Sequence, residues 1–200
     1  MKTLILIVSA LFSLHVSAQS VQMHVLGQGD SYWITATKRE HTFQVVYARR
    51  DSTDGRKLNK LAQQRGITLR MIATNFGEFG SEQKKRLDEY SALRESCTYY
   101  TKDSLRFKAD AEPRFTQLFD SLLILSEKDL NTNLRAKEKY FILDGTSFSW
   151  VITDHTTVKN VYAHAPQENS YPLLYHYIKA CLNLYRTRIK GDLLRNFMGY

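Results

Sequence analysis

The sequence predicts an α+β domain, with a mostly antiparallel sheet built from two hairpins and about four helices covering one face of that sheet. Apolar and polar residues alternate over 32–49 and again over 147–164, as they do in half-buried strands. Between and after these stretches, apolar residues recur at helical spacing over 113–123 and 173–185. The mixed order of strands and helices favours an open sheet with segregated helices over a doubly wound one.

The first 18 residues have the pattern of a secretory signal peptide. Lys2 supplies a short charged region, Leu4 to Leu14 form an apolar run, and Val16-Ser17-Ala18 ends on the small residues that signal peptidase prefers. The apolar run is too short for a transmembrane helix, which needs about 20 residues. We therefore expect export to the periplasm or the medium, with residues 1–18 removed and residues 19–200 forming a single soluble domain.

The N-terminal half of the domain is expected to begin with a lead-in that includes a short strand at 23–26. A hairpin over 32–37 and 42–49 follows, and residues 51–54 then offer N-caps for a helix that ends at Gly66. Residues 67–74 alternate like another strand, Ser81 caps a helix that runs to about Cys97, and 99–107 adds one or two short strands. Pro113 opens a strongly amphipathic helix.

The stretch from Tyr140 to Tyr185 is predicted to fold as one unit of three strands and a helix. Its strands are expected over 140–143, 147–153 and 157–164. Ser170 is the expected N-cap of the final helix, and Pro172 falls in the first helical turn, where a missing N–H costs little.

Charge and composition bear on the class of partner. The chain carries 28 Lys and Arg against 20 Asp and Glu, a net charge of +8, but the basic residues are scattered and no nucleic-acid reading motif accompanies them. We therefore expect no nucleic-acid partner, no transmembrane segment in the mature chain, and a protein as the binding partner.

The two cysteines, Cys97 and Cys181, are a candidate disulfide pair, since an even number of cysteines in an oxidising compartment favours a bridge. Both also lie on apolar helical stripes, where cysteine packs as a small hydrophobic residue. The sequence leaves both interpretations open, because the distance between the two Cα atoms decides the matter.

The loop at 75–80 is the candidate binding site, through Phe76, Glu78 and Phe79. Exposed phenylalanines at this position would form a partner-binding patch, whereas rings folded back would close the edge of the core. The loop precedes a helix, but it lacks the spacing of a P-loop or of a dinucleotide fingerprint, so no phosphate site is expected.

No catalytic or metal-binding motif is present, and we expect no cofactor and no metal. The histidines show no paired ligand spacing, and the Gly-x-Ser-x-Gly pattern of many hydrolases is absent. The least unfavourable hydrolase constellation combines Asp144, Asp154, His164 and Ser170 at one edge of the C-terminal sheet. Turn and cap roles explain the same residues without catalysis.

Three functions remain compatible with the sequence. The favoured one is an exported domain without a catalytic site that binds another protein in the cell envelope or outside the cell. The alternatives are a secreted or periplasmic hydrolase and an inhibitor or immunity-type protein that neutralises a toxin or hydrolase.

Overall fold

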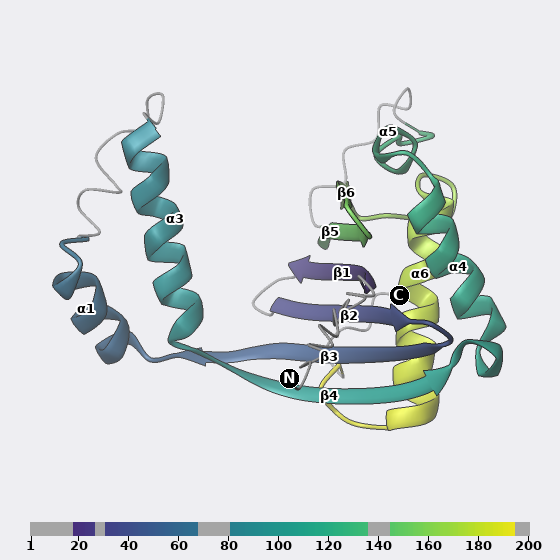
Figure 1. Ribbon diagram of the computed structural model, residues 1–200, viewed down its shortest axis with the longest axis horizontal. Coiled ribbons are helices and arrows are strands. Elements are labelled where there is room, and N and C mark those ends of the chain that lie inside the picture. The colour runs from purple at the N-terminus through teal and green to yellow at the C-terminus, as the bar shows by residue number, and fades with distance from the viewer. Residues whose placement is uncertain (1–17, 27–30, 68–80, 136–144, 195–200) are drawn as a thin grey trace, which may run out of the picture.

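The computed structural model contains one six-stranded antiparallel sheet, with the strand order β4-β3-β2-β1-β5-β6 (Figure 1). It describes residues 18–26, 31–67, 81–135 and 145–194. The predicted α+β class and the two hairpins, β2–β3 and β5–β6, are confirmed. The strands are β1 Gln19–Leu26, β2 Ser31–Arg39, β3 Thr42–Thr53, β4 Thr98–Lys108, β5 Ser147–Asp154 and β6 Thr157–His164. The helices in these described ranges are α1 Gly55–Gln64, α3 Ser81–Ser96, η1 Ala109–Ala111, α4 Pro113–Ile124, α5 Glu127–Leu130, α6 Pro172–Leu184 and the π-helix η2 Tyr185–Ile189.

Strand β1 joins the two hairpins into one sheet. It pairs antiparallel with β2 along its whole length and with β5 from Ser20 to Leu26. Its alternate residues Val21, Met23 and Val25 are fully buried. The sequence predicted only a short strand at 23–26, so the segment is twice as long as expected and lies at the centre of the sheet.

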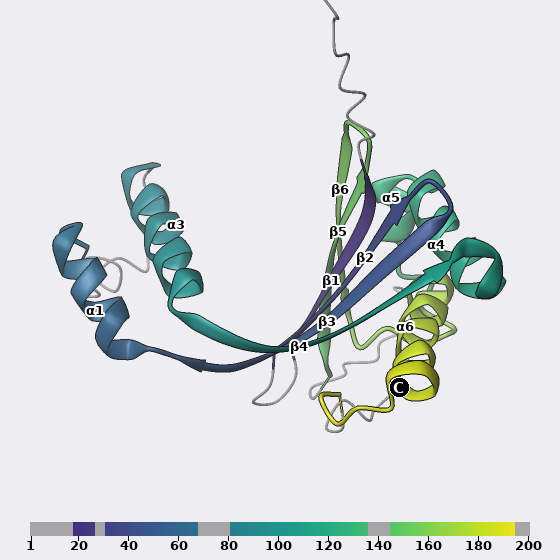
Figure 2. The same cartoon turned by 60° about the horizontal axis from the view of Figure 1, so that its bottom comes forward.

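The main core lies between one face of the sheet and helices α4 and α6. Four phenylalanines, two from β3–β4 and two from α4, pack with ring centroids 4.9–6.5 Å apart. Such aromatic pairs stabilise a core beyond the area that they bury. Figure 2 shows α4 and α6 on this side of the sheet. The rings are those of Phe43, Phe107, Phe115 and Phe119.

Helices α1 and α3 do not cover the sheet; they pack against each other at the far end of the β3–β4 ribbon, and we call this pair the arm (Figures 1 and 2). The arm has a small core of its own, formed by Leu58, Ala62, Ile67, Leu93 and Cys97. Helix α1 begins as predicted, since the side chain of Asp54 accepts a hydrogen bond of 2.9 Å from the Lys57 N–H.

A buried lysine fixes the C-terminal end of α4 to the sheet. Lys159 of β6 points into the core, and its ammonium group donates hydrogen bonds to the main-chain oxygens of Leu122, Leu123 and Leu125. The last carbonyl groups of a helix have no partners within the helix, and a cation at this end also favours the helix dipole.

One sequence-based expectation about a single residue is wrong. Ser170 is not the N-cap of α6: that position is Tyr171, and the Ser170 hydroxyl instead bonds within the preceding turn to Gln167. Cys97 and Cys181 are both free, because Cys97 lies in the core of the arm and Cys181 in the main core. Of the predicted strand at 67–74 only Ile67 is described, and the predicted strand at 140–143 lies outside the described residues.

Candidate interaction surface

The second face of the sheet, which we call the open face, is not covered by any helix in the described part of the chain. Because side chains alternate across a strand, the residues between the buried ones point to this face. Along β1, for example, Gln22, His24 and Leu26 alternate with buried Val21, Met23 and Val25.

A row of three contacting rings crosses the open face from β1 to β4. His24 of β1 lies opposite Trp33 of β2, with ring centroids 4.3 Å apart and planes 9° from parallel. The rings of Trp33 and Tyr100, the latter from β4, have centroids 5.1 Å apart and planes 88° apart, a T-shaped contact. Tyr100 in turn donates hydrogen bonds of 2.6 and 2.7 Å to the Glu95 carboxylate of α3, which ties the arm to the sheet.

The electrostatics of this row keep its rings neutral. Burial, followed by the nearby Arg50 guanidinium, lowers the pKa of His24 below 6.5, with Glu95 opposing the shift. Burial and the hydrogen bond to Glu95 raise the pKa of Tyr100 to about 12. The row therefore offers neutral aromatic surface at physiological pH rather than an activated acid or base.

One half of the open face is uncharged, with four exposed apolar side chains among polar ones, and the other half carries the basic side chains. Leu26, Val151, Val158 and Tyr162 are 40–57% exposed, and all four occupy open-face positions on β1, β5 and β6. No Asp or Glu occupies an open-face position in the described strands. The basic side chains at such positions, mainly on the β2–β4 half, include Arg39, Arg50, Lys102 and Arg106.

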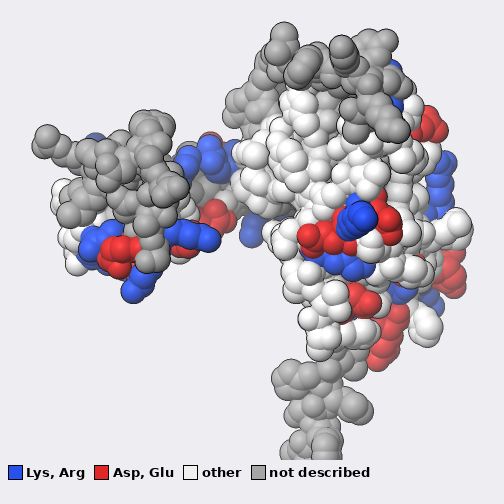
Figure 3. All heavy atoms as spheres, turned by 90° about the horizontal axis from the view of Figure 1, so that it is seen from above, with Lys and Arg blue, Asp and Glu red and all other residues white. Residues whose placement is uncertain are grey.

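The arm is joined to the main body by the end of the β3–β4 ribbon, which we call the waist. In Figure 3 the flank of the main body nearest the arm is largely uncharged, while Lys and Arg gather at the waist. Figure 2 shows the arm rising on the side of the sheet opposite α4 and α6, which is the side of the open face.

The hydrolase constellation suggested by the sequence does not assemble. Asp154 and His164 lie at opposite ends of the β5–β6 hairpin, since Asp154 pairs with Thr157 and His164 with Ser147. Eight-residue strands separate those ends by about 23 Å. Ser170 is used in its own turn, and Asp144 lies outside the described residues.

His164 has a different neighbour, Ser147. The Ser147 hydroxyl lies 3.1 Å from His164 Nδ1 and accepts a hydrogen bond of 3.1 Å from the Tyr162 hydroxyl. These three side chains are cross-strand neighbours on β5 and β6, the ordinary positions for polar pairs in a sheet. A nucleophile also needs oriented donors for the developing oxyanion, and the geometry around Ser147 within the described residues supplies none.

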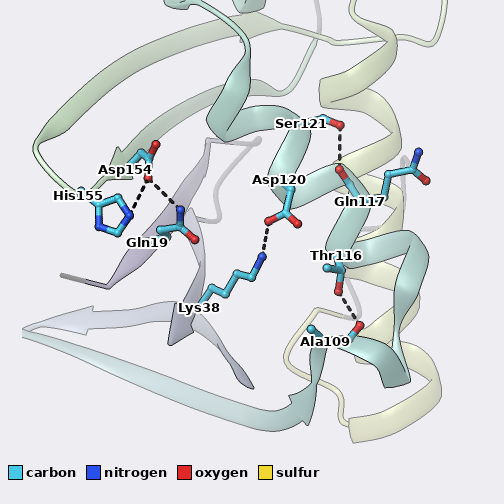
Figure 4. A network of polar contacts seen from close by, with 9 residues as sticks. All are labelled: Gln19, Lys38, Ala109, Thr116, Gln117, Asp120, Ser121, Asp154 and His155. Atoms are coloured by element: carbon cyan, nitrogen blue, oxygen red, sulfur yellow. Dashed lines mark hydrogen bonds and ion pairs between the residues drawn. The ribbon is translucent and has the colours of Figure 1, made fainter. Parts of the chain in front are cut away.

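A pocket of about 650 Å³ opens where the β2–β3 turn meets the start of α4, and it is the second candidate site. Asp120 on its wall is held at 2.5 Å by the Lys38 ammonium, and the Thr116 hydroxyl donates to the Ala109 carbonyl at 2.8 Å (Figure 4). These polar groups are thus already engaged in joining α4 to β2 and η1. No group of three or more potential metal ligands occurs in the described ranges.

The two cysteines are not reactive candidates either. Burial raises the pKa of the Cys181 thiol to about 12, so the nucleophilic thiolate is not formed at neutral pH. Phe76, Glu78 and Phe79, the predicted binding residues, lie outside the described residues. The row of rings on the open face was not predicted from the sequence. The alternation over 32–49 assigns Tyr32 and Ile34 to one face of β2, and it therefore already placed Trp33 on the other face.

Comparison with protein families, with curated proteins and with solved structures found no match for this chain. None of the described helices is long and apolar enough to cross a membrane.

Proposed function

We propose that this chain is an exported protein that binds another protein through the open face of its sheet. The observation that carries the proposal is the uncovered face itself, which presents the rings of His24, Trp33 and Tyr100 together with exposed apolar side chains on one half and basic side chains on the other. Aromatic residues and arginine are enriched at protein interfaces, and exposed apolar side chains fit the centre of such an interface. Export rests on the signal-peptide pattern of residues 1–18.

The size of the open face suits a protein partner. Six strands spaced by about 4.8 Å span about 24 Å, and a strand of eight residues is about 26 Å long. The flat area is therefore about 600 Å², close to the ~800 Å² that each partner buries in a standard interface. A partner that also touched the arm would bury more.

The uncharged half of the face, with its exposed aliphatic side chains, favours protein over nucleic acid. A platform for single-stranded nucleic acid needs rings whose faces are open for bases to stack on. Here Trp33 already stacks on His24 and makes a T-shaped contact with Tyr100. Aliphatic side chains such as Val151 and Val158 have no role on such a platform, whereas they fit the apolar centre of a protein interface.

Site-specific photo-crosslinking in cells that naturally produce the protein tests this proposal. A benzophenone side chain is placed at Tyr162 or Val158 on the open face, and in a matched control at Ile124, which is 82% exposed on α4. We expect one protein to crosslink from both open-face positions and not from Ile124. The Val151→Glu variant should abolish that crosslink, because it places a charge at the uncharged half of the interface.

Two results would overturn the proposal. One is equal crosslinking from Ile124 and from the open face, or no protein crosslink at all. The other is capture of nucleic acid from the open-face positions with a steep dependence on salt, which would indicate phosphate contacts instead.

A further inference from the structure

The two edges of the sheet differ in whether their outward backbone groups are already hydrogen-bonded, which decides whether another strand can pair there. At the β6 edge, side chains of α5 occupy the outward backbone groups. The Asn160 N–H donates to Glu127 Oε2 at 2.8 Å, and the Tyr162 N–H donates to Asn131 Oδ1 at 2.9 Å. Asn131 Nδ2 also donates to the Asn160 carbonyl at 3.1 Å. This edge cannot accept another strand without losing these bonds.

The outward backbone groups of the other edge strand, β4, follow from the hairpin register. The two-residue turn between Arg39 and Thr42 makes these two residues a hydrogen-bonded pair, and such pairs alternate along an antiparallel ladder. Phe43, Val45 and Tyr47 therefore bond to β4 through Phe107, Leu105 and Asp103, their partners in the register. The residues between these, Lys102, Ser104 and Arg106, direct their N–H and C=O groups away from the sheet.

The same rule can be checked at β6. Its two-residue turn pairs Asp154 with Thr157, which assigns outward backbone groups to Asn160 and Tyr162. Those are the residues that α5 satisfies. Along β4, by contrast, no hydrogen bond to the backbone of Lys102, Ser104 or Arg106 comes from outside the β3 ladder in the described ranges.

The charges along β4 select the kind of strand that could pair there. Lys102 and Arg106 are exposed on the open-face side, and Ser104 between them is exposed and uncharged. The one carboxylate among the neighbouring residues, Asp103, points to the opposite face and accepts a 2.6 Å hydrogen bond from the Tyr185 hydroxyl. An incoming strand with acidic residues at alternate positions would place them beside the two cations, a favourable cross-strand arrangement.

A second copy of this chain is a poor occupant of the same edge. Antiparallel pairing of two β4 strands about a two-fold axis at Ser104 would place Lys102 of each copy opposite Arg106 of the other. Like charges directly opposite each other destabilise a strand pair. The edge therefore favours a different chain of opposite charge.

We propose that β4 binds an extended acidic segment of a partner protein as a seventh strand of the sheet, by strand addition along Lys102–Arg106. This inference rests on the proposed function, since it gives the chemistry of the partner and the manner in which it binds. Backbone hydrogen bonds to the outward groups would supply affinity, and Lys102 and Arg106 would select acidic side chains.

Backbone amide exchange measured by NMR on the mature chain, residues 19–200, tests the inference. The probe is a nine-residue peptide in which glutamate alternates with valine and threonine, and the matched control peptide has lysine at each glutamate position. We expect the glutamate peptide at saturation to slow exchange at Lys102, Ser104 and Arg106 by about tenfold or more, and the lysine peptide to have no effect.

Substitutions at Ser104 separate strand addition from simple charge attraction. Proline at an outward position of an edge strand removes a donor without breaking the existing ladder. Ser104→Pro should therefore abolish binding of the glutamate peptide, while Ser104→Ala, which keeps the N–H, should bind as the wild type does. Should Ser104→Pro fail to fold, the double reversal Lys102→Glu with Arg106→Glu serves instead: the lysine peptide, in place of the glutamate peptide, should then slow amide exchange at Ser104, whereas charge attraction alone would leave that exchange unchanged.

The outcomes distinguish this inference from the proposed function. No protection of the β4 amides, or unchanged binding by Ser104→Pro, overturns strand addition. Polyglutamate or single-stranded DNA that shifts Lys102 and Arg106 side-chain signals without protecting backbone amides would also overturn it, because that result indicates charge attraction alone. Crosslinking from Tyr162 that survives Ser104→Pro would leave the open-face proposal intact while removing the inference.

Discussion

Lys159→Met should destabilise the protein substantially, because it removes the cation that closes the C-terminal end of α4. The Lys159 side chain is only 9% exposed, and its ammonium group serves the carbonyl groups of Leu122, Leu123 and Leu125. A hydrogen bond to a charged group contributes about 1.5–3 kcal/mol, and a cation at a helix C-terminus up to about 2 kcal/mol. Methionine keeps the apolar stem but leaves the carbonyl groups without a donor.

The gain from no longer burying a charge offsets part of that loss. Burying an ion costs several kcal/mol, and methionine avoids that cost. However, the substitution removes only the ammonium group, and the carbonyl groups that it served stay buried. We therefore expect a net loss of about 2–4 kcal/mol in the free energy of unfolding. Urea unfolding followed by far-UV circular dichroism measures it, with Lys128→Met on exposed α5 as the matched control that should change by under about 0.5 kcal/mol. A Lys159→Met protein as stable as the wild type would refute the reasoning.

Two further substitutions test other parts of the structure. His24 has a folded-state pKa below 6.5, so as pH falls below about 6.5 the unfolded chain gains a proton that the folded chain does not. Stability should therefore fall as the pH is lowered from 7 to 5, and His24→Phe should remove the contribution of His24 to that fall. The midpoint of urea unfolding, measured at each pH for both proteins, checks this. An equal change of the midpoint with pH in the two proteins would contradict it. Gly191→Ala should cost about 1–3 kcal/mol, because a Cβ there would lie 2.5 Å from the Tyr185 hydroxyl and 3.0 Å from Asp103 Oδ2. Its matched control, Gly55→Ala, has open space around the added Cβ and should be neutral or slightly stabilising in thermal unfolding; equal melting temperatures for the two variants would count against the close approach at Gly191.

The sequence predicted the hairpins well because each has a buried face of its own. Period-2 alternation in residues such as Phe148, Trp150 and Ile152 is a local signal, and the structure confirms β5, β6 and α6 nearly to the residue. Strand β1 was underestimated, because the importance of Val21 and Met23 comes from neighbours on both sides that are distant in sequence. The N-cap of α6 was misplaced, since Ser170 can satisfy its own turn equally well.

The open face could be deduced only in part. Alternation assigns Trp33 to the face opposite Tyr32, but it does not say whether a helix covers that face. The two helices predicted before Gly66 and between Ser81 and about Cys97 have apolar residues that could have packed on the sheet. In the structure they pack on each other instead, at the end of a β3 strand of 12 residues whose register shifts between Arg50 and Ser52. Such a shift increases the local bend and twist of a strand, which moves the following helices off the sheet.

The arm also sets the limits of the free edge of β4. At the end nearest the arm, Glu95 holds Tyr100, so an acidic strand that extended past Lys102 would meet a carboxylate of like charge. At the other end, the chain leaves the sheet after Lys108 and turns into η1. The run between, Lys102 to Arg106, is five residues or about 17 Å long, which is the length of a typical strand. A partner strand bound there would lie next to the basic half of the open face. Pairing with the edge and contact with the face would therefore favour the same acidic partner.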